Sequence, residues 1–179
     1  MKSTLLAIAK KFNDHNIMWG IGGSLMLKNY GIVDKCNDID LIVDVKDYKM
    51  VDKILSDLGI KEPVASKANY GTKHFSKYIV NGVEVDIIAE FIIYHDEGQY
   101  EYIFDNNSIC KQSDKGIELP YTKVEDWYIL YLLMEREQKA VLIEQYLSDK
   151  MVDNILVERA LNQPLPNSLK VRVSSVLKY

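Results

Sequence analysis

The segment from Asp38 to Val45 reads Asp-Ile-Asp-Leu-Ile-Val-Asp-Val, and it restricts the possible folds of this chain more than any other stretch. Its β-branched residues predict a strand. Side chains two apart in a strand point to the same face, so Asp38 and Asp40 project together while the apolar residues between them point toward a core. The segment therefore predicts a sheet with a pair of carboxylates on one face.

Helix and strand patterns alternate through the first 60 residues. Apolar positions at helical spacing and glycine punctuation define each element. The predicted elements are a helix over Ser3–Asn13 with Ser3 as N-cap, a strand over Ile17–Ile21 closed by Gly22-Gly23, a helix over Ser24–Tyr30, and a helix over Tyr48–Leu58 ended by Gly59. This alternation predicts an α/β fold.

An antiparallel pair is predicted next, because Asn81-Gly82 separates two β-rich runs, His74 to Val80 and Val83 to Ala89. Asn-Gly between such runs is the strongest short hairpin signal. In a two-residue hairpin Val80 pairs with Val83, and counting back places Lys77 opposite Asp86. The pair therefore adds two strands to the sheet.

The rest of the chain predicts fewer strands and more helix. We expect one or two short strands between Phe91 and Leu119, a helix from Thr122, a second from about Gln138 to Leu147, and a short one within Pro164–Tyr179. The predicted fold class is α/β (α+β), a small mixed sheet flanked by helices. Residues 1–120 form this domain, and residues 121–179 form a helical segment packed on or beside it.

Composition limits the partners. A chain of 179 residues has length for one core, and 22 basic against 26 acidic residues give a net charge of −4, which disfavours long nucleic acid as a partner. Charges interrupt every apolar run, and the amphipathic start lacks the features of a signal peptide, so we expect a cytoplasmic protein without a membrane partner. Cys36 and Cys110 lack metal-site spacing and are interpreted as reduced thiols.

Two neighbouring carboxylates repel each other, and a divalent cation is the usual remedy where they are partly buried. Mg²⁺ prefers oxygen ligands and is commonly held by one or two carboxylates and substrate phosphates. The pair therefore predicts a phosphate-bearing partner. Gly22, Gly23 and Ser24 lie between a predicted strand and a predicted helix, where the helix N-terminus could bind a phosphate group. Gly-Gly-Ser is also an ordinary turn and N-cap.

Asp86 is a third candidate, on a strand that alternates acidic and apolar residues. The hairpin register offers a rival interpretation, in which Lys77 and Asp86 form an exposed cross-strand ion pair worth about 0 to 1 kcal/mol. In isolation, the two interpretations have equal weight.

Taken in order, the Gly-Gly-Ser turn, the Asp-Ile-Asp strand and the later Asp86 resemble the signature of the nucleotidyltransferase superfamily, over roughly Ile17 to Glu90. Residues Gly116 to Leu133 are more loosely similar to small lincosamide, aminoglycoside-type and AbiEii-like members. The resemblance implies a mixed sheet flanked by helices and an enzyme that transfers a nucleoside monophosphate, AMP by preference, from a nucleoside triphosphate to an acceptor hydroxyl.

Residue by residue, the resemblance implies that Asp38 and Asp40 bind two Mg²⁺ ions, or Mn²⁺ in their place, and that Asp86 completes the metal site near the acceptor. Gly22, Gly23 and Ser24 would hold the triphosphate. The chain departs from expectation in having few basic residues near the motif, where only Lys28 and Lys35 are close in sequence.

Three functions remain open at this point. The acceptor could be a small molecule, for which the negative net charge favours a cation, or a protein side chain. The chain could also be the nucleotidyltransferase of a toxin–antitoxin pair. The third alternative is a non-catalytic nucleotide-binding regulatory module, which the presence of all three carboxylates disfavours.

Overall fold

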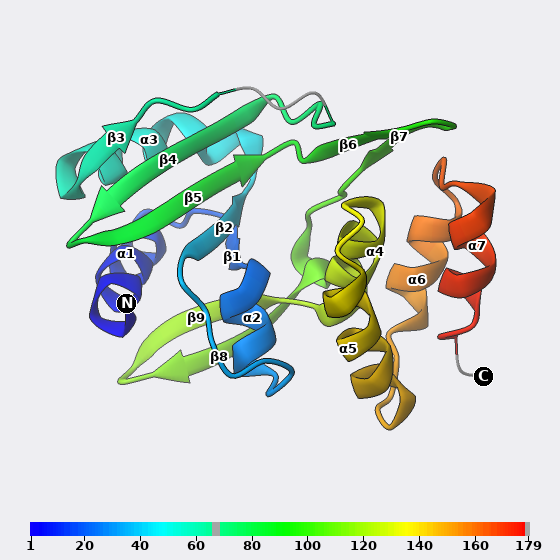
Figure 1. The fold of residues 1–179 in the computed structure, drawn as a ribbon. Coiled ribbons are helices and arrows are strands. Elements are labelled where there is room, and N and C mark those ends of the chain that lie inside the picture. Colours follow the sequence, from blue (N-terminus) through cyan, green and yellow to red (C-terminus); the bar gives the residue numbers. More distant parts are fainter. Residues whose placement is uncertain (66–68, 178–179) are drawn as a thin grey trace.

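A computed structural model describes residues 1–65 and 69–177, and it contains a mixed sheet with helices on both faces and a group of helices at one end (Figure 1). The strands are β1 (Trp19–Ile21), β2 (Ile39–Val43), β3 (Ile60–Glu62), β4 (His74–Val80), β5 (Val83–Ala89), β6 (Ile92–His95), β7 (Gly98–Glu101), β8 (Ile109–Asp114) and β9 (Ile117–Thr122). The helices are α1 (Lys2–Asp14), α2 (Gly23–Asn29), α3 (Tyr48–Leu58), α4 (Val124–Leu133), α5 (Glu137–Ser148), α6 (Asn154–Leu161) and α7 (Asn167–Ser174), with 3-10 turns η1 (Val45–Asp47) and η2 (Asn106–Ser108). The main sheet has the order β3-β4-β5-β2-β1-β9-β8, and β6 and β7 form a separate hairpin.

The alternation of β2 separates the two faces of the sheet as predicted. Its apolar residues Ile39, Leu41 and Val43 are buried. The face that they share is covered by α3, since Tyr78 of β4 on this face hydrogen bonds Asp52 of α3. The opposite face carries Asp40 and lies beside α2. The mixed α/β fold class is confirmed.

The hairpin prediction is confirmed in its register. Val80 pairs with Val83, and Lys77 pairs with Asp86. Asn81 and Gly82 have φ values of 51° and 72°, the left-handed conformation that both central residues of a type I′ turn require. This turn sets the alignment of β4 with β5, and the separate pairing of β5 with β2 places Asp86 opposite Asp40.

The prediction of Ser3 as an N-cap is wrong, and of the two interpretations of the Gly-Gly-Ser turn the N-cap does not hold for Ser24. Ser3 lies inside α1, whose N-cap is Met1, because the Leu5 amide already donates to the Met1 carbonyl. Ser24 is the second residue of α2, and its N-cap is Gly22. The strand predicted to begin at Asp38 begins at Ile39, and the helix Tyr48–Leu58 has the predicted bounds. The hydroxyl of Ser24 is therefore available for another contact.

The segment between residues 91 and 119 contains more strands than predicted. Here β6, β7, β8 and the start of β9 replace the expected one or two, and β3 and α6 were not predicted either. Short polar strands such as β7 depend on their partners rather than on their own pattern. Strand β9 continues to Thr122, two residues past the predicted domain boundary. Helix α7 lies within the range Pro164–Tyr179, where a short helix was predicted, and residues 178 and 179 of that range lie outside the described residues.

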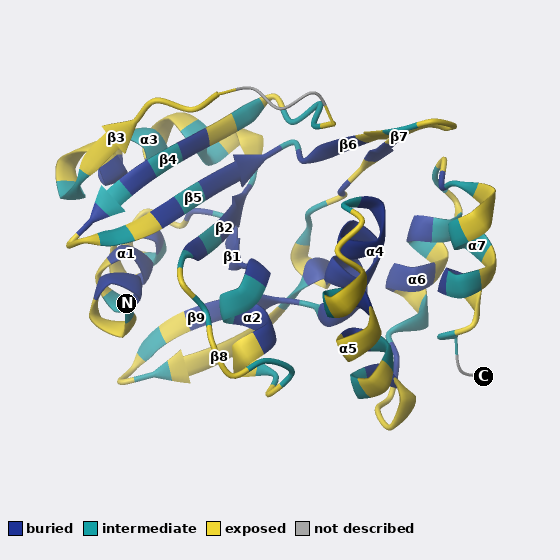
Figure 2. Ribbon diagram, viewed as in Figure 1, coloured by how far each residue is buried: buried dark blue, intermediate teal, exposed yellow. Residues whose placement is uncertain are grey.

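Helix α4 is buried along its whole length rather than on one face (Figure 2). It packs between α2 and β6 on one side and α5 and α6 on the other. A helix that is apolar all round is expected in such a position. It has ten residues, and no helix in the described ranges is long and apolar enough to cross a membrane.

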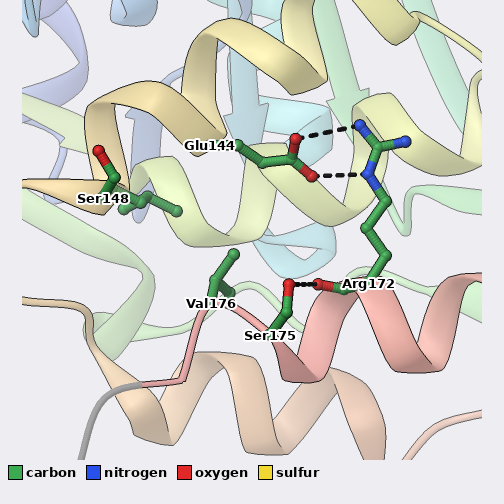
Figure 3. A pocket seen from close by; sticks show the side chains of 6 residues that line it. Glu144, Ser148, Arg172, Ser175 and Val176 are labelled. Carbon is green, nitrogen blue, oxygen red and sulfur yellow. Dashed lines mark hydrogen bonds and ion pairs between the residues drawn. The ribbon is translucent and has the colours of Figure 1, made fainter.

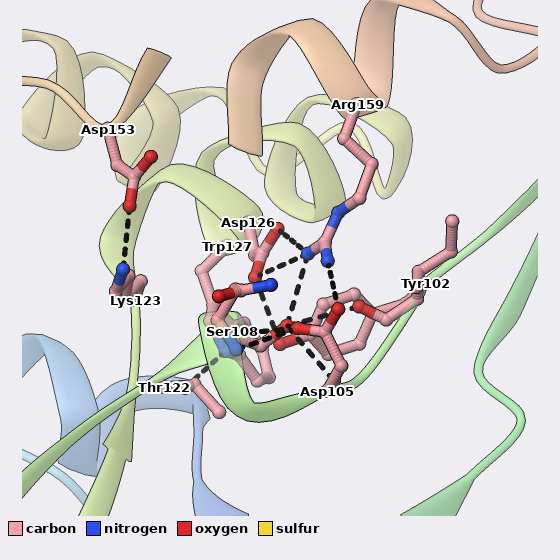
Figure 4. A network of polar contacts seen from close by, with 11 residues as sticks. Tyr102, Asp105, Ser108, Thr122, Lys123, Asp126, Trp127, Asp153 and Arg159 are labelled. Carbon is pink, nitrogen blue, oxygen red and sulfur yellow. Dashed lines mark hydrogen bonds and ion pairs between the residues drawn. The ribbon is translucent and has the colours of Figure 1, made fainter. Parts of the chain in front are cut away.

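Two arginines hold the C-terminal helices in place. Arg159 of α6 pairs with the buried Asp126 of α4 and with Asp105, each at 3.1 Å (Figure 4). Arg172 of α7 pairs with Glu144 of α5 at 2.6 Å (Figure 3) and with Glu137 at 2.7 Å. The contacts of Arg172 hold α5 in place, and the first turn of α5 faces the candidate active site.

Candidate active site

The turn between β1 and α2 touches both β2 and α4. The Gly22 amide donates to the Asp40 carbonyl at 2.8 Å. A Cβ atom on Gly22 would lie 2.1 Å from the Trp127 ring, and one on Gly23 would lie 1.7 Å from the Asp40 carboxylate. Gly23 also has a φ of 59°, which favours glycine. Both positions therefore require glycine, because the backbone packs directly against an aromatic ring and a carboxylate.

The three predicted carboxylates gather beside this turn. Asp40 of β2 and Asp86 of β5 are register partners on neighbouring parallel strands, so they share one face of the sheet. Asp38 lies directly before β2, two residues from Asp40 on that strand. Burial raises the pKa of Asp40 to about 7, and the charges of Asp38 and Asp86 contribute to the rise. The carboxylates thus act on one another through space.

The ion pair with Lys77 accounts for only part of the environment of Asp86. Lys77 donates to Glu84 at 2.8 Å and approaches Asp86 at 3.7 Å. The oxygen that Lys77 approaches, Oδ1, is buried, and at this distance it has no hydrogen-bond partner among the residues described. Burial raises the pKa of Asp86, and the Lys77 charge opposes the rise. An exposed, satisfied ion pair does not describe this residue.

Two cations that sequence reasoning missed lie at the site, and both come from the start of α5. The Lys139 ammonium donates to the Ser24 hydroxyl at 2.8 Å, across 115 residues of sequence. Arg136 lines the same pocket as Asp40. The charges of both residues lower the pKa of Asp40 against the effect of burial. Lys28 and Lys35, the candidates near the motif, are exposed, and no local pattern distinguishes Arg136 and Lys139 from other surface cations.

The carboxylates suit a divalent cation by their chemistry. Within the ranges 1–65 and 69–177 no three His, Cys, Asp or Glu side chains are already arranged as a metal cluster. A cation would nevertheless give the buried Asp86 oxygen a partner and relieve the repulsion that raises the pKa of Asp40. Carboxylate oxygens are also the ligands that Mg²⁺ prefers. Asp38, Asp40 and Asp86 therefore fit such an ion.

A pocket of about 350 Å³ opens beside Asp40. Its walls are mostly apolar and include the aromatic residues Tyr70, Phe75, Phe91, Trp127 and Tyr131. Arg136 and Lys73 also line it, and Lys73 is paired with Glu90 at 3.2 Å. A second hollow of about 410 Å³ lies between α5 and α7, where Arg172 is already paired with Glu144 (Figure 3). None of the three carboxylates lines that hollow. Of these two hollows, the first is therefore the one that a ligand could occupy beside Asp40.

No protein-family model matches this chain, and no curated protein matches it. Solved structures match most of it. A protein from Thermotoga maritima, named as a candidate nucleotidyltransferase, has a TM-score of 0.65 at 22% identity and covers 83% of this chain and 92% of its own. The solution structure of the antibiotic-resistance factor ANT(2″)-Ia has a TM-score of 0.57 at 16% identity over 98% and 94% of the two chains. The lincosamide adenylyltransferase LnuA, bound to lincomycin, has a TM-score of 0.53 at 16% identity over 80% and 96%. At these identities the likeness establishes the fold, and this protein therefore has the nucleotidyltransferase fold.

Proposed function

We propose that this protein is a metal-dependent nucleotidyltransferase, which moves a nucleoside monophosphate, AMP by preference, from a nucleoside triphosphate to an acceptor hydroxyl. The observation that carries the proposal is the register match of Asp40 and Asp86 on parallel strands, with Asp38 and the Gly22-Gly23 turn beside them. This arrangement concentrates negative charge beside a glycine turn that packs directly against the Asp40 carboxylate. The fold found in the adenylyltransferases supports it.

In this proposal Asp38, Asp40 and Asp86 hold two Mg²⁺ ions, which Mn²⁺ could replace. When bound, the ions would lower the pKa of the acceptor hydroxyl and neutralise charge on the leaving pyrophosphate. The acceptor oxygen forms a bond to the α-phosphorus, and the bond from that phosphorus to the bridging oxygen of the β-phosphate breaks. Asp86 would orient the acceptor hydroxyl or accept its proton.

The triphosphate would lie along the turn of Gly22, Gly23 and Ser24. Three carboxylates alone would repel it, so cations are needed near the phosphates. Lys139 and Arg136 supply them, since both lie beside Asp40 and Lys139 already contacts Ser24. The sequence offered few basic residues near the motif, Lys28 and Lys35, and Lys139 and Arg136 add two that come from a distant part of the chain.

The comparisons support a small-molecule acceptor. One structure of ANT(2″)-Ia, with a TM-score of 0.53, contains adenylyl-2″-tobramycin, and the LnuA structure contains lincomycin. Here the pocket beside Asp40 has aromatic walls and two cations, Lys73 and Arg136. The aromatic side chains in this lining favour an acceptor that contains a ring. A protein side chain is the other acceptor class to be tested.

The test is incubation with Mg²⁺ and each labelled nucleoside triphosphate, with small-molecule hydroxyl compounds and candidate proteins as acceptors. We expect pyrophosphate release and a labelled acceptor with wild type, activity with Mn²⁺, and neither product in EDTA. The Asp40→Asn variant is the matched control. Pyrophosphate release no greater than with Asp40→Asn, for every nucleotide and acceptor, would refute the proposal.

A further inference from the structure

Tyr131 of α4 is fully buried, yet its hydroxyl has no hydrogen-bond partner among the residues described. Buried polar groups are paired in the great majority of cases, and an unpaired one lowers stability. Only a few side-chain atoms in the described ranges share this condition, and one of the others belongs to Asp86 at the candidate site. A ligand in the pocket that Tyr131 lines would supply the missing partner.

The surroundings of Tyr131 suit a negatively charged ligand. The Lys139 ammonium lies 4.9 Å from the centroid of the Tyr131 ring, and the Arg136 guanidinium carbon lies 5.9 Å from it. The ring lines the pocket that Asp40 also lines. Burial and the carboxylates of Asp40 and Asp38 raise the pKa of Tyr131, so the phenol is protonated at neutral pH and acts as a donor.

Ser24 completes a group of hydrogen-bond donors. Its hydroxyl accepts a hydrogen bond from the Lys139 ammonium at 2.8 Å. Ser24 is also close enough to Tyr131 to lower the pKa of that phenol, although the two hydroxyls form no hydrogen bond of acceptable geometry. Lys139, Arg136 and the two hydroxyls thus meet at one place. Donors of this kind recognise phosphate oxygens.

We propose that the Tyr131 hydroxyl donates a hydrogen bond to a phosphate oxygen of the bound nucleotide, together with Lys139 and Arg136. This inference rests on the proposed function, because it names a further contact of the same site. The hydroxyl is closed to water in the structure, so a neighbouring side chain moves when the anion binds. The Lys139 ammonium, which donates to Ser24, would then donate to the phosphate in a charge-assisted bond.

The variant Tyr131→Phe tests this proposal, because it keeps the ring, its packing and its contacts with the two cations and removes only the hydroxyl. The probes are Mg²⁺ with inorganic tripolyphosphate, which lacks a base, and Mg²⁺ with ATP. We expect calorimetry to show about tenfold weaker binding of both, equivalent to about 1.4 kcal/mol. The Tm without ligand should stay the same or rise, because an unpaired buried hydroxyl is lost.

Tyr78→Phe is the matched control. Tyr78 is equally buried, but its hydroxyl is paired with Asp52 on the opposite face of the sheet. Its loss should lower the Tm and leave tripolyphosphate binding unchanged. If wild type binds both probes and Tyr131→Phe binds them equally tightly, the inference about Tyr131 is wrong. If wild type binds neither probe, the proposed function itself fails.

Discussion

Replacing Asp40 by Asn should stabilise the metal-free protein at neutral pH while it abolishes nucleotidyl transfer. Burial and the charges of Asp38 and Asp86 raise the pKa of Asp40 from 3.8 to about 7 in the native state. The unfolded chain releases this proton near pH 4, so between these values the native state binds more protons than the unfolded state. The free energy of unfolding of the wild type therefore falls as the pH rises from 4 to 7.

The size of the effect follows from the two pKa values. Each pKa unit corresponds to about 1.4 kcal/mol, so the difference between 3.8 and about 7 sets an upper limit of about 4 kcal/mol. Asp40 is not completely buried, so water screens part of this, and we expect about 2 kcal/mol. Asn carries no charge at any pH. Its advantage over Asp should therefore be absent at pH 4 and fully developed at pH 8.

The assay is urea unfolding of wild type and Asp40→Asn at pH 4, 6 and 8, in EDTA and again in excess Mg²⁺. Mg²⁺ should stabilise the wild type by mass action and have no such effect on the variant. Asp44→Asn is the control directly after the same strand, because the Lys46 contacts lower the pKa of Asp44 and its replacement should destabilise. An Asp40→Asn protein that is less stable than wild type at pH 8 in EDTA would refute the reasoning.

Three further outcomes are expected. Gly23→Ala should lower the free energy of unfolding, measured in urea, by more than about 2 kcal/mol, because its Cβ would strike the Asp40 carboxylate. Gly82→Ala should lower the same free energy by about 1 kcal/mol, because Gly82 has a positive φ but open space around it. Asp86→Asn should slow single-turnover transfer at least a hundredfold, while Lys77→Met should keep the rate within about twofold of wild type. Equal rates for Asp86→Asn and wild type would show that Asp86 has no role in catalysis. Lys139→Met should raise the KM for the triphosphate at least tenfold, because it removes a charge-assisted hydrogen bond worth about 1.5 to 3 kcal/mol. An unchanged KM would show that the phosphates lie elsewhere.

The local sequence was sufficient for features whose physics is local. Alternation in Asp38–Val45 placed two carboxylates on one face, and Asn81-Gly82 determined a type I′ turn and hence the register that puts Lys77 opposite Asp86. The glycine pair was recognised as a place of close approach. Its reason, contact with Trp127 and with the Asp40 carboxylate, could not be read from the chain, since Trp127 lies more than a hundred residues away.

Tertiary structure decided the rest of the site. The parallel pairing of β2 with β5 brings Asp86 beside Asp40, and the packing of α4 and α5 against α2 brings Tyr131, Arg136 and Lys139 to the same place. The chain alone predicts helices there, but the direction in which a helix presents its cations depends on how it docks. The sequence by itself thus determined the carboxylate strand, the glycine turn and the hairpin, because neighbouring residues set backbone geometry and alternation. Only the tertiary structure decided which cations and which buried hydroxyl face the carboxylates, because long-range packing sets those positions.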